Sequence, residues 1–172
     1  QQQDGIAVAV EVRTINSRFF KLSIRASEGY NGLESHIDEV VRETIRRGGS
    51  VLMPAFAVGR AQALLLLLQR LKASGQIPQK LPIFLDSPMA IEATTLYRQF
   101  RRLLRVPAAE IERLTDGVTM VTTGAQSMRL TRSRYPSVII SASGMATGGR
   151  VLHHLKAMAP HPQHHVVFAG FQ

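Results

Sequence analysis

Residues 137–156 read SVIISASGMATGGRVLHHLK and contain an apolar strand, a glycine-rich turn and a helix in direct succession. Ser137–Ser141 is apolar in character rather than alternating, which is typical of a strand buried on both faces. The glycines that follow permit a close backbone approach, and a helical pattern runs from Gly149 to Met158. A strand that passes directly into a helix in this way predicts a parallel sheet covered by helices.

The same alternation of strands and helices continues on the amino-terminal side and to the end of the chain. Short apolar runs predict strands at 51–55, 82–86, 117–121 and 164–169, and helical patterns occupy 59–74, 89–104, 107–114 and 125–134. The expected fold class is therefore α/β, with a mostly parallel sheet flanked by helices. Alternating runs at 6–12 and 19–25 and a helical pattern at 33–45 predict a preceding ββα unit, which Gly48-Gly49 ends. The sequence thus predicts a ββα segment at 1–48 and an α/β domain at 49–172.

Charge divides the chain at the same point. Residues 1–49 carry seven basic and seven acidic side chains, whereas residues 50–172 carry fourteen basic and five acidic ones. The whole net charge of +9 therefore lies in the second part, where eight arginines fall between Arg98 and Arg134. A basic stretch favours a polyanionic partner such as RNA, with a solvated helical face as the alternative.

Composition also excludes several kinds of site. The chain has no cysteine, which excludes disulfides, thiolate metal sites and cysteine nucleophiles and suits a cytoplasmic location. No run approaches about 18 uncharged apolar residues, so no membrane span or membrane partner is expected. The histidines show no metal-binding spacing, and the adjacent His153 and His154 would point about 100° apart on a helix. The start, Gln1–Asp4, is neither a signal peptide nor a normal initiation site, so we expect the chain to begin within a longer protein.

The glycine-rich turn is the first candidate site, because ligands of open α/β sheets gather at the carboxyl ends of the strands. Glycines and the free N–H groups of a helix start favour an oxyanion, hydroxyl groups add donors, and an arginine fork suits phosphate. The spacing is neither a Walker loop nor Gly-x-Gly-x-x-Gly, and a turn without a ligand is the alternative. The candidate phosphate-binding residues here are Ser143, Gly144, Thr147, Gly148, Gly149 and Arg150.

Three further candidates lie at other strand ends. Asp86 ends a predicted strand and either caps the next helix together with Ser87 or orients a basic group. Arg60 lies at the start of a predicted helix, where a cation opposes the helix dipole unless an anion is near. Arg60, Asp86 and Ser87 therefore join the predicted phosphate-binding or RNA-binding set.

Three ordered segments resemble the β-CASP family: Pro54–Gln62 (PAFAVGRAQ), Leu85–Ala90 (LDSPMA) and Ser137–Lys156, with Val166–Gln172 also fitting. These proteins are nucleic-acid-processing members of the metallo-β-lactamase fold and include RNase J-like enzymes and the cleavage subunit of the eukaryotic mRNA 3′-end machinery. The resemblance implies a zinc-dependent ribonuclease whose His-x-His-x-Asp-His cluster and other zinc ligands have no counterpart in this chain. It therefore implies no catalytic residue, metal ligand or cofactor here, and an RNA-cleft wall at Ala57–Arg60, Asp86-Ser87 and Ser143–Arg150.

The first part of the chain resembles a different family. Residues 10–20 (VEVRTINSRFF), followed by Arg25, Gly29-Tyr30, Leu33-Glu34 and Arg46–Gly48, resemble the amino-terminal region of YicC-like proteins, which are linked to RNA turnover and stress. Both families would have a helix that ends in an Arg-Gly type stop at the join. The chain is thus an apparent hybrid, for which a natural rearrangement, a mispredicted gene and a deliberate recombination all stay open.

The leading hypothesis is the RNA-binding part of a zinc-dependent β-CASP ribonuclease family, inactive as this isolated chain. Its expected partner is single-stranded RNA, bound without sequence specificity. One alternative is a nucleotide- or phosphate-binding small-molecule enzyme of doubly wound type, and another is a chimera that folds without biochemical function. Whether the chain forms a homo-oligomer is left open.

Overall fold

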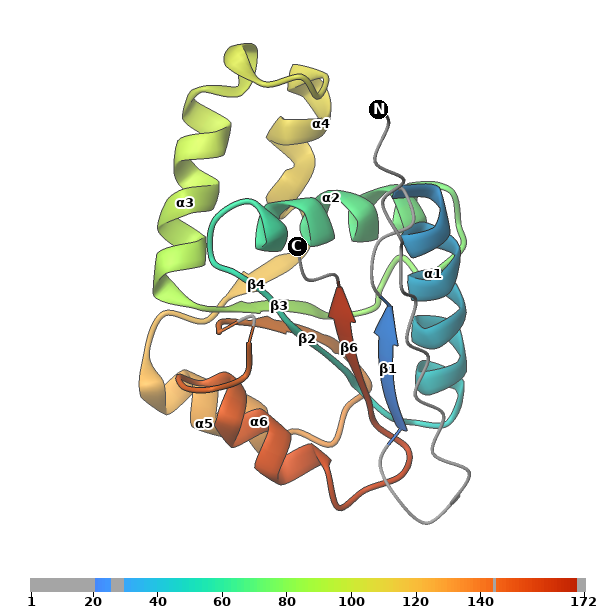
Figure 1. Ribbon diagram of the computed structural model, residues 1–172. Coiled ribbons are helices and arrows are strands. Elements are labelled where there is room, and N and C mark those ends of the chain that lie inside the picture. The colour runs from blue at the N-terminus through green and yellow to red at the C-terminus, as the bar shows by residue number, and fades with distance from the viewer. Residues whose placement is uncertain (1–20, 26–29, 144, 170–172) are drawn as a thin grey trace, which may run out of the picture.

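A single parallel sheet organises the computed structural model, which describes residues 21–25, 30–143 and 145–169 (Figure 1). Its six described strands have the order β1-β6-β2-β5-β3-β4, and every described strand pair is parallel. The strands are β1 (Lys21–Arg25), β2 (Val51–Pro54), β3 (Ile83–Asp86), β4 (Val118–Met120), β5 (Val138–Ser141) and β6 (His165–Ala169). The predicted α/β class is confirmed, while the strand expected at residues 6–12 lies outside the described residues.

Helices cover both faces of the sheet. α1 and α2 pack on one face, and α5 and α6 pack on the other (Figure 1). The helices are α1 (Tyr30–Arg46), α2 (Arg60–Ala73), α3 (Pro88–Gln99), α4 (Ala108–Glu112), α5 (Gly124–Thr131) and α6 (Val151–Met158), with short 3-10 turns η1 (Arg101–Leu103) and η2 (Arg113–Thr115). No helix of the described part is long and apolar enough to cross a membrane.

Burial on both faces explains why the strands read as continuous apolar runs. Along β2, Val51 and Met53 pack with α1 and α2, whereas Leu52 between them packs with α5 and α6. Neighbouring side chains of a strand point to opposite faces, so each face receives apolar residues from the same short run. Two apolar layers therefore enclose the sheet.

Helix starts are fixed by side-chain caps that the sequence contains. The Ser87 hydroxyl accepts a hydrogen bond from the Ala90 N–H at 3.2 Å, and Pro88 occupies the first turn of α3. Thr123 and Gln126 form a capping box at the start of α5, in which each side chain accepts the other's backbone N–H. These caps set the direction in which each helix leaves the carboxyl end of a strand.

α1 is packed into the same molecule as the rest of the sheet. Ile37, Val40 and Val41 are buried in the core that α2 shares. The Thr44 hydroxyl lies 2.7 Å from His165 Nδ1, which ties α1 to β6. Because β1 also pairs with β6, the described residues of the expected ββα unit belong to the central architecture.

Two glycines make the connection from α1 to β2 possible. Gly48 has a φ of 75°, the left-handed conformation common after a helix. A Cβ at Gly49 would lie only 1.9 Å from the Gln163 carbonyl oxygen, so no side chain fits there without backbone movement. Beside them, the Ser50 N–H donates to His164 Nδ1 at 2.9 Å. We call Thr44, Gly49, Ser50, His164 and His165 the amino-edge contact.

Residues 88–115 form an arm that rises from the sheet. α3 leads away from the carboxyl end of β3, and α4 returns beside it (Figure 1). The predicted helix 89–104 is shorter than expected, since α3 ends at Gln99 and η1 follows it. Ile111 and Leu114 are buried at the base of the arm, which anchors it on α2.

Candidate functional site

The predicted site residues come together because three strands end side by side. The parallel register pairs Pro54 of β2 with Ser141 of β5, and Ser141 in turn with Asp86 of β3. The carboxyl ends of these strands therefore form one continuous edge, from which the loops to α2, α3 and α6 begin. This carboxyl edge is the position at which open α/β sheets bind ligands.

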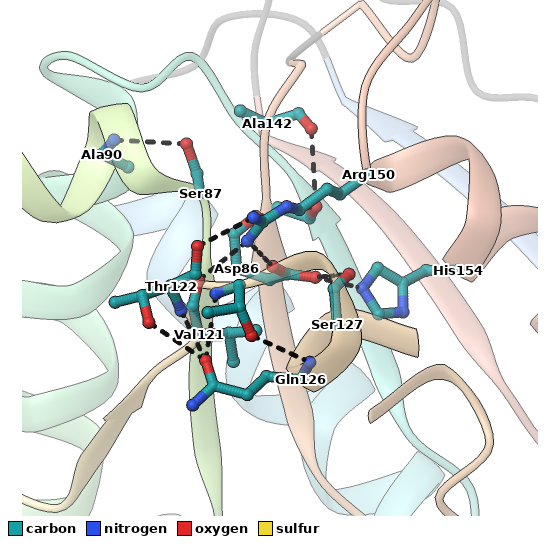
Figure 2. Close-up of polar contacts among 12 residues, drawn as sticks. Asp86, Ser87, Ala90, Val121, Thr122, Gln126, Ser127, Ala142, Arg150 and His154 are labelled. Carbon is teal, nitrogen blue, oxygen red and sulfur yellow. Dashed lines mark hydrogen bonds and ion pairs between the residues drawn. The ribbon is translucent and has the colours of Figure 1, made fainter. Parts of the chain in front are cut away.

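Asp86 is the centre of a buried polar network. The sequence is compatible with two roles for it, a helix cap or a group that orients a basic side chain. Its side chain has no exposed surface and accepts hydrogen bonds from Ser127 Oγ at 2.5 Å, Arg150 Nη1 at 2.8 Å and His154 Nε2 at 2.7 Å (Figure 2). Asp86 thus orients basic groups, while Ser87 alone caps α3. We call Asp86, Ser127, Arg150 and His154 the Asp86 network.

The ionisation of Asp86 follows from a balance of two opposing effects. Burial raises the pKa of the carboxyl group, because a low-dielectric surrounding disfavours its charged form. The hydrogen bonds from His154, Ser127 and Arg150 outweigh burial and hold the pKa of Asp86 below its ordinary value. A charged carboxylate therefore stays inside the protein at neutral pH and keeps its donors in place.

Arg150 points into the protein rather than away from it. Besides Asp86, its guanidinium donates to the carbonyl oxygens of Val121 and Thr122, each at 2.9 Å (Figure 2). The side chain of Arg150 thus links the start of α6 to β3 and to the loop after β4. Sequence reasoning predicted a phosphate fork, and the structure shows three of its N–H groups already used within the chain.

His154 is a part of the site that sequence reasoning did not select. It is completely buried on α6, and its Nδ1 lies 3.1 Å from the Thr131 hydroxyl while its Nε2 lies 2.7 Å from Asp86. Its position four residues after Arg150 was a usable signal, because residues at that spacing share one face of a helix. Ser127 gave no comparable signal.

The glycine-rich turn presents its polar groups at the surface. Thr147 is exposed and Ser143 half-buried, and neither hydroxyl bonds to another of the residues the structure describes. Gly149 has a φ of 76°, and an added Cβ would lie 3.2 Å from the Ala142 carbonyl oxygen. Gly148 is half-buried with open space around it, whereas Gly144 lies outside the described residues. The turn therefore has hydroxyl donors that are not used within the described residues. Its backbone at residue 149 has a conformation that only glycine adopts easily.

The loop before α2 is held by a buried glutamine that sequence reasoning missed. Gln62 Oε1 accepts the Gly59 N–H at 2.7 Å, and Gln62 Nε2 donates to the Thr94 hydroxyl at 2.9 Å. These bonds fasten the loop to α3 and place Arg60 at the amino end of α2. Arg60 is half-buried and forms no ion pair with another residue in the described ranges.

The described residues do not fit a zinc site. They contain no group of three or more His, Asp and Glu side chains that could hold a metal ion. Both carboxylate oxygens of Asp86, the acidic group of the Asp86 network, are occupied by donors from the protein itself. Zinc needs several converging free ligands, and these residues do not supply them.

Comparisons with known proteins match the two parts of the chain to two families. Residues 61–172 match the Beta-Casp domain, and residues 1–56 match the YicC-like endoribonuclease amino-terminal region. Ribonuclease TTHA0252 of Thermus thermophilus is 37% identical over 143 residues, which cover 78% of this chain and 32% of the relative. An RNase J-like protein of Methanocaldococcus jannaschii is 33% identical over 141 residues, which cover 81% of this chain and 32% of the relative.

An archaeal transcription termination factor is also similar to this chain. Transcription termination factor FttA of Methanosarcina mazei is 33% identical over 147 residues, which cover 81% of this chain and 23% of the relative. The chain thus spans about a third or less of the length of these relatives. The alignment with the Thermus thermophilus ribonuclease covers 78% of the 172 residues, so it includes residues 39–56 wherever it begins. The YicC-like match covers the same residues.

Proposed function

The chain belongs to the Beta-Casp domain family, and on that premise we propose that its carboxyl edge is the RNA-facing wall of a ribonuclease-type protein. The family is one of RNA-processing proteins of the metallo-β-lactamase fold, and the relatives named above are ribonucleases and a termination factor. The observation that carries the proposal is the Asp86 network. It fixes Arg150 at the end of the glycine-rich turn, whose Ser143 and Thr147 hydroxyl groups bond to no other described residue.

The proposed phosphate contacts come from the turn and from Arg60, and Arg150 acts mainly through its position. Ser143 and Thr147 supply hydroxyl donors, and Arg60 supplies a charge that no described acidic residue neutralises. An anion beside the amino end of α2 would also relieve the unfavourable meeting of Arg60 with the helix dipole. Arg150 keeps the turn in shape because its guanidinium is bound to Asp86, Val121 and Thr122.

Salt dependence separates a residue that touches phosphate from one that shapes the site. Each lost phosphate contact lowers the slope of log affinity against log salt by about one. We expect weak, sequence-independent binding of single-stranded RNA, and Arg60→Gln should lower both its affinity and its salt slope. Arg150→Gln should lower affinity with little change of slope, whereas the slope would fall by about one if Arg150 touched phosphate. Lys80→Gln is the control with the same loss of charge outside this edge.

Three results would contradict the proposal. Equal losses from Arg60→Gln and Lys80→Gln would mean that RNA is attracted by a diffuse positive surface. Binding of free nucleotides in preference to RNA would favour the doubly wound small-molecule enzyme, and no binding of either would favour a chimera without biochemical function. The measurement is fluorescence anisotropy of a labelled oligouridylate and of a labelled nucleotide over a salt series.

Catalysis is not proposed for this chain by itself. The zinc ligands that the family resemblance implies have no counterpart among its residues, and Asp86 has no free oxygen to offer a metal. We expect no retained equivalent of zinc and no metal-dependent RNA cleavage by the purified chain. Metal analysis after dialysis and an RNA cleavage assay with and without a chelator test this; chelator-sensitive cleavage would contradict it.

A further inference from the structure

The tip of the arm, Arg98–Arg105, combines uncompensated positive charge with exposed apolar side chains. These eight residues include four arginines and no acidic residue. Arg98, Arg102 and Arg105 are exposed, and so are Phe100 and Leu103, which keep 50% and 80% of their surface in solvent. The tip thus places an exposed aromatic ring and an exposed leucine within a few residues of three exposed arginines.

The acidic groups nearest to the tip are already paired. Arg101 Nε lies 2.6 Å from Glu112 on α4, so the tip's remaining arginines gain no partner from that side. Glu110 of the same helix lies 2.6 Å from Arg70 on α2. The exposed arginines of the tip therefore keep their charge available for a ligand.

Contacts at the base of the arm join it to α2. The Arg70–Glu110 pair joins α4 to α2, and Gln69 Nε2 donates to the Asp116 carbonyl oxygen at 2.7 Å. Ile111 and Leu114 are buried beneath them. The arm that carries the tip is therefore packed on the rest of the molecule at its base, and packing that is in place before a partner binds lowers the entropic cost of association.

We propose that the arm tip is a second RNA contact, at which a base of single-stranded RNA stacks on Phe100 while Arg98, Arg102 and Arg105 contact phosphates. The proposal rests on the proposed function, because it assumes that RNA also lies along the carboxyl edge. Aromatic rings among arginines are the combination that binds single-stranded nucleic acid without sequence preference. A second copy of the chain fits less well, since four arginines facing four arginines repel.

The position of the tip determines which RNA reaches it. α3 begins at the carboxyl end of β3 and has 12 residues, so its far end lies about 18 Å from that edge at 1.5 Å per residue. A short oligonucleotide can fill only one of the two contacts, whereas a longer strand can fill both. Only a longer strand should therefore gain affinity from both contacts together.

The test compares labelled oligouridylates of about 4 and about 16 nucleotides, the range covered by single-strand binding modules. Wild-type protein should bind the long RNA more tightly than the short one. Phe100→Leu, which keeps an apolar side chain, should weaken long-RNA binding about 5-fold or more, in line with the loss of one stacked base. The double variant Arg102→Gln/Arg105→Gln should do the same and lower the salt slope by about two.

The matched control is Arg132→Gln/Arg134→Gln, which removes two exposed arginines outside the arm. If this control weakens long-RNA binding as much as the tip variants do, the tip is no distinct contact and the inference fails. It also fails if tip variants change the sedimentation of the protein rather than its RNA affinity, since the tip would then bind another protein chain. If Arg60→Gln weakens binding while the tip variants do not, the proposed function stands and only this inference falls.

Discussion

The two ends of the sheet are closed by polar contacts of opposite character. At the carboxyl end, the Asp86 network encloses a full negative charge and its basic partners. At the amino end, the amino-edge contact consists of hydroxyl groups, imidazoles and backbone groups in close steric contact. The first arrangement supports an exposed turn, and the second joins α1 to strands far away in the sequence. A charged network thus positions the site, while close packing holds the two parts of the chain together.

The largest expected effect comes from the closest contact of the amino edge. Gly49→Ala places a Cβ 1.9 Å from the Gln163 carbonyl oxygen, so backbone atoms of β6's preceding loop have to move. We expect a loss of about 4 kcal/mol or more in unfolding free energy, which is exceptional for a single substitution. Urea unfolding followed by circular dichroism measures it.

Gly48→Ala is the matched control for that experiment. Gly48 has open space around its Cα, and only its φ of 75° opposes a side chain. The cost should be about 1–2 kcal/mol, the usual penalty of the left-handed conformation. Equal costs at both glycines would show that β6 does not approach Gly49 as described.

The next effect breaks the carboxyl edge. Asp86→Ala leaves His154 fully buried and Arg150 mostly buried without their carboxylate partner. Removing one member of a buried charged pair costs about 3–5 kcal/mol. Thermal unfolding should show this loss, together with weaker RNA binding, because the turn loses its support. Asp116→Asn, at an exposed aspartate, should stay within about 0.5 kcal/mol of wild type; a comparable loss there would contradict the comparison.

A smaller effect tests the tie between α1 and β6. Thr44→Val keeps the shape of the side chain and removes its hydrogen bond to His165. One buried hydrogen bond contributes about 1 kcal/mol. Thr95→Val, which removes the exposed bond to the Ile91 carbonyl, is the control and should change unfolding less. If the two variants behave alike, Thr44 and His165 do not join the helix to the sheet.

The smallest effect is a difference in pH dependence between the two edges. Burial, and then the nearby charge of His161, lower the pKa of His164 below that of an unfolded histidine. The unfolded chain therefore binds a proton more readily, so this contribution to stability is complete above about pH 6.5 and declines as the pH falls below it. Asp86, whose pKa is also lowered, loses its contribution only below about pH 3.9.

Between pH 7.5 and pH 4.5 the unfolding free energy should thus decline as the contribution of His164 is lost. The Asp86 network should stay intact over the same range. His164→Gln should flatten part of this decline, because it removes the titrating group next to Ser50. An unchanged slope in His164→Gln would assign the decline to other histidines.

Local patterns predicted the fold well because each described element is encoded by its own residues. The apolar run of β5 and the cap at Ser87 each mark an element that the structure contains. The predicted end of the helix 89–104 was wrong, because α3 ends at Gln99. No residue near Gln99 is a helix breaker, and the shorter α3 depends on its packing with α4. The position of β6 between β1 and β2 depends on contacts across the whole chain, which no local pattern contains.

The site was predictable as a place but not as a set of interactions. Strand ends and glycines located the carboxyl edge, because the topology of parallel sheets fixes where loops gather. The inward direction of Arg150 and the partners of His154 depend on side-chain geometry at buried Asp86. Phosphate binding by the nine selected residues stays a prediction.

The boundary between the two families is less sharp than the change of charge suggests. The YicC-like match reaches residue 56, and the similarity to the ribonuclease of Thermus thermophilus includes residues 39–56. The second half of α1 and β2 are therefore compatible with both families. The division after Gly48 stays a prediction. At the join, α1 is the element that proteins of both families would contain.

The strand order has a consequence for synthesis on the ribosome. β6 is the last described strand to be made, yet it lies between β1 and β2, which are among the first. Among the described strands β1 pairs only with β6, and about 140 further residues are made before β6 emerges. At about 5–20 residues per second, that delay is about 7–28 seconds. During this time β1 and β2 lack the strand that lies between them, so the order of translation leaves their facing edges open to the contacts that a chaperone prevents.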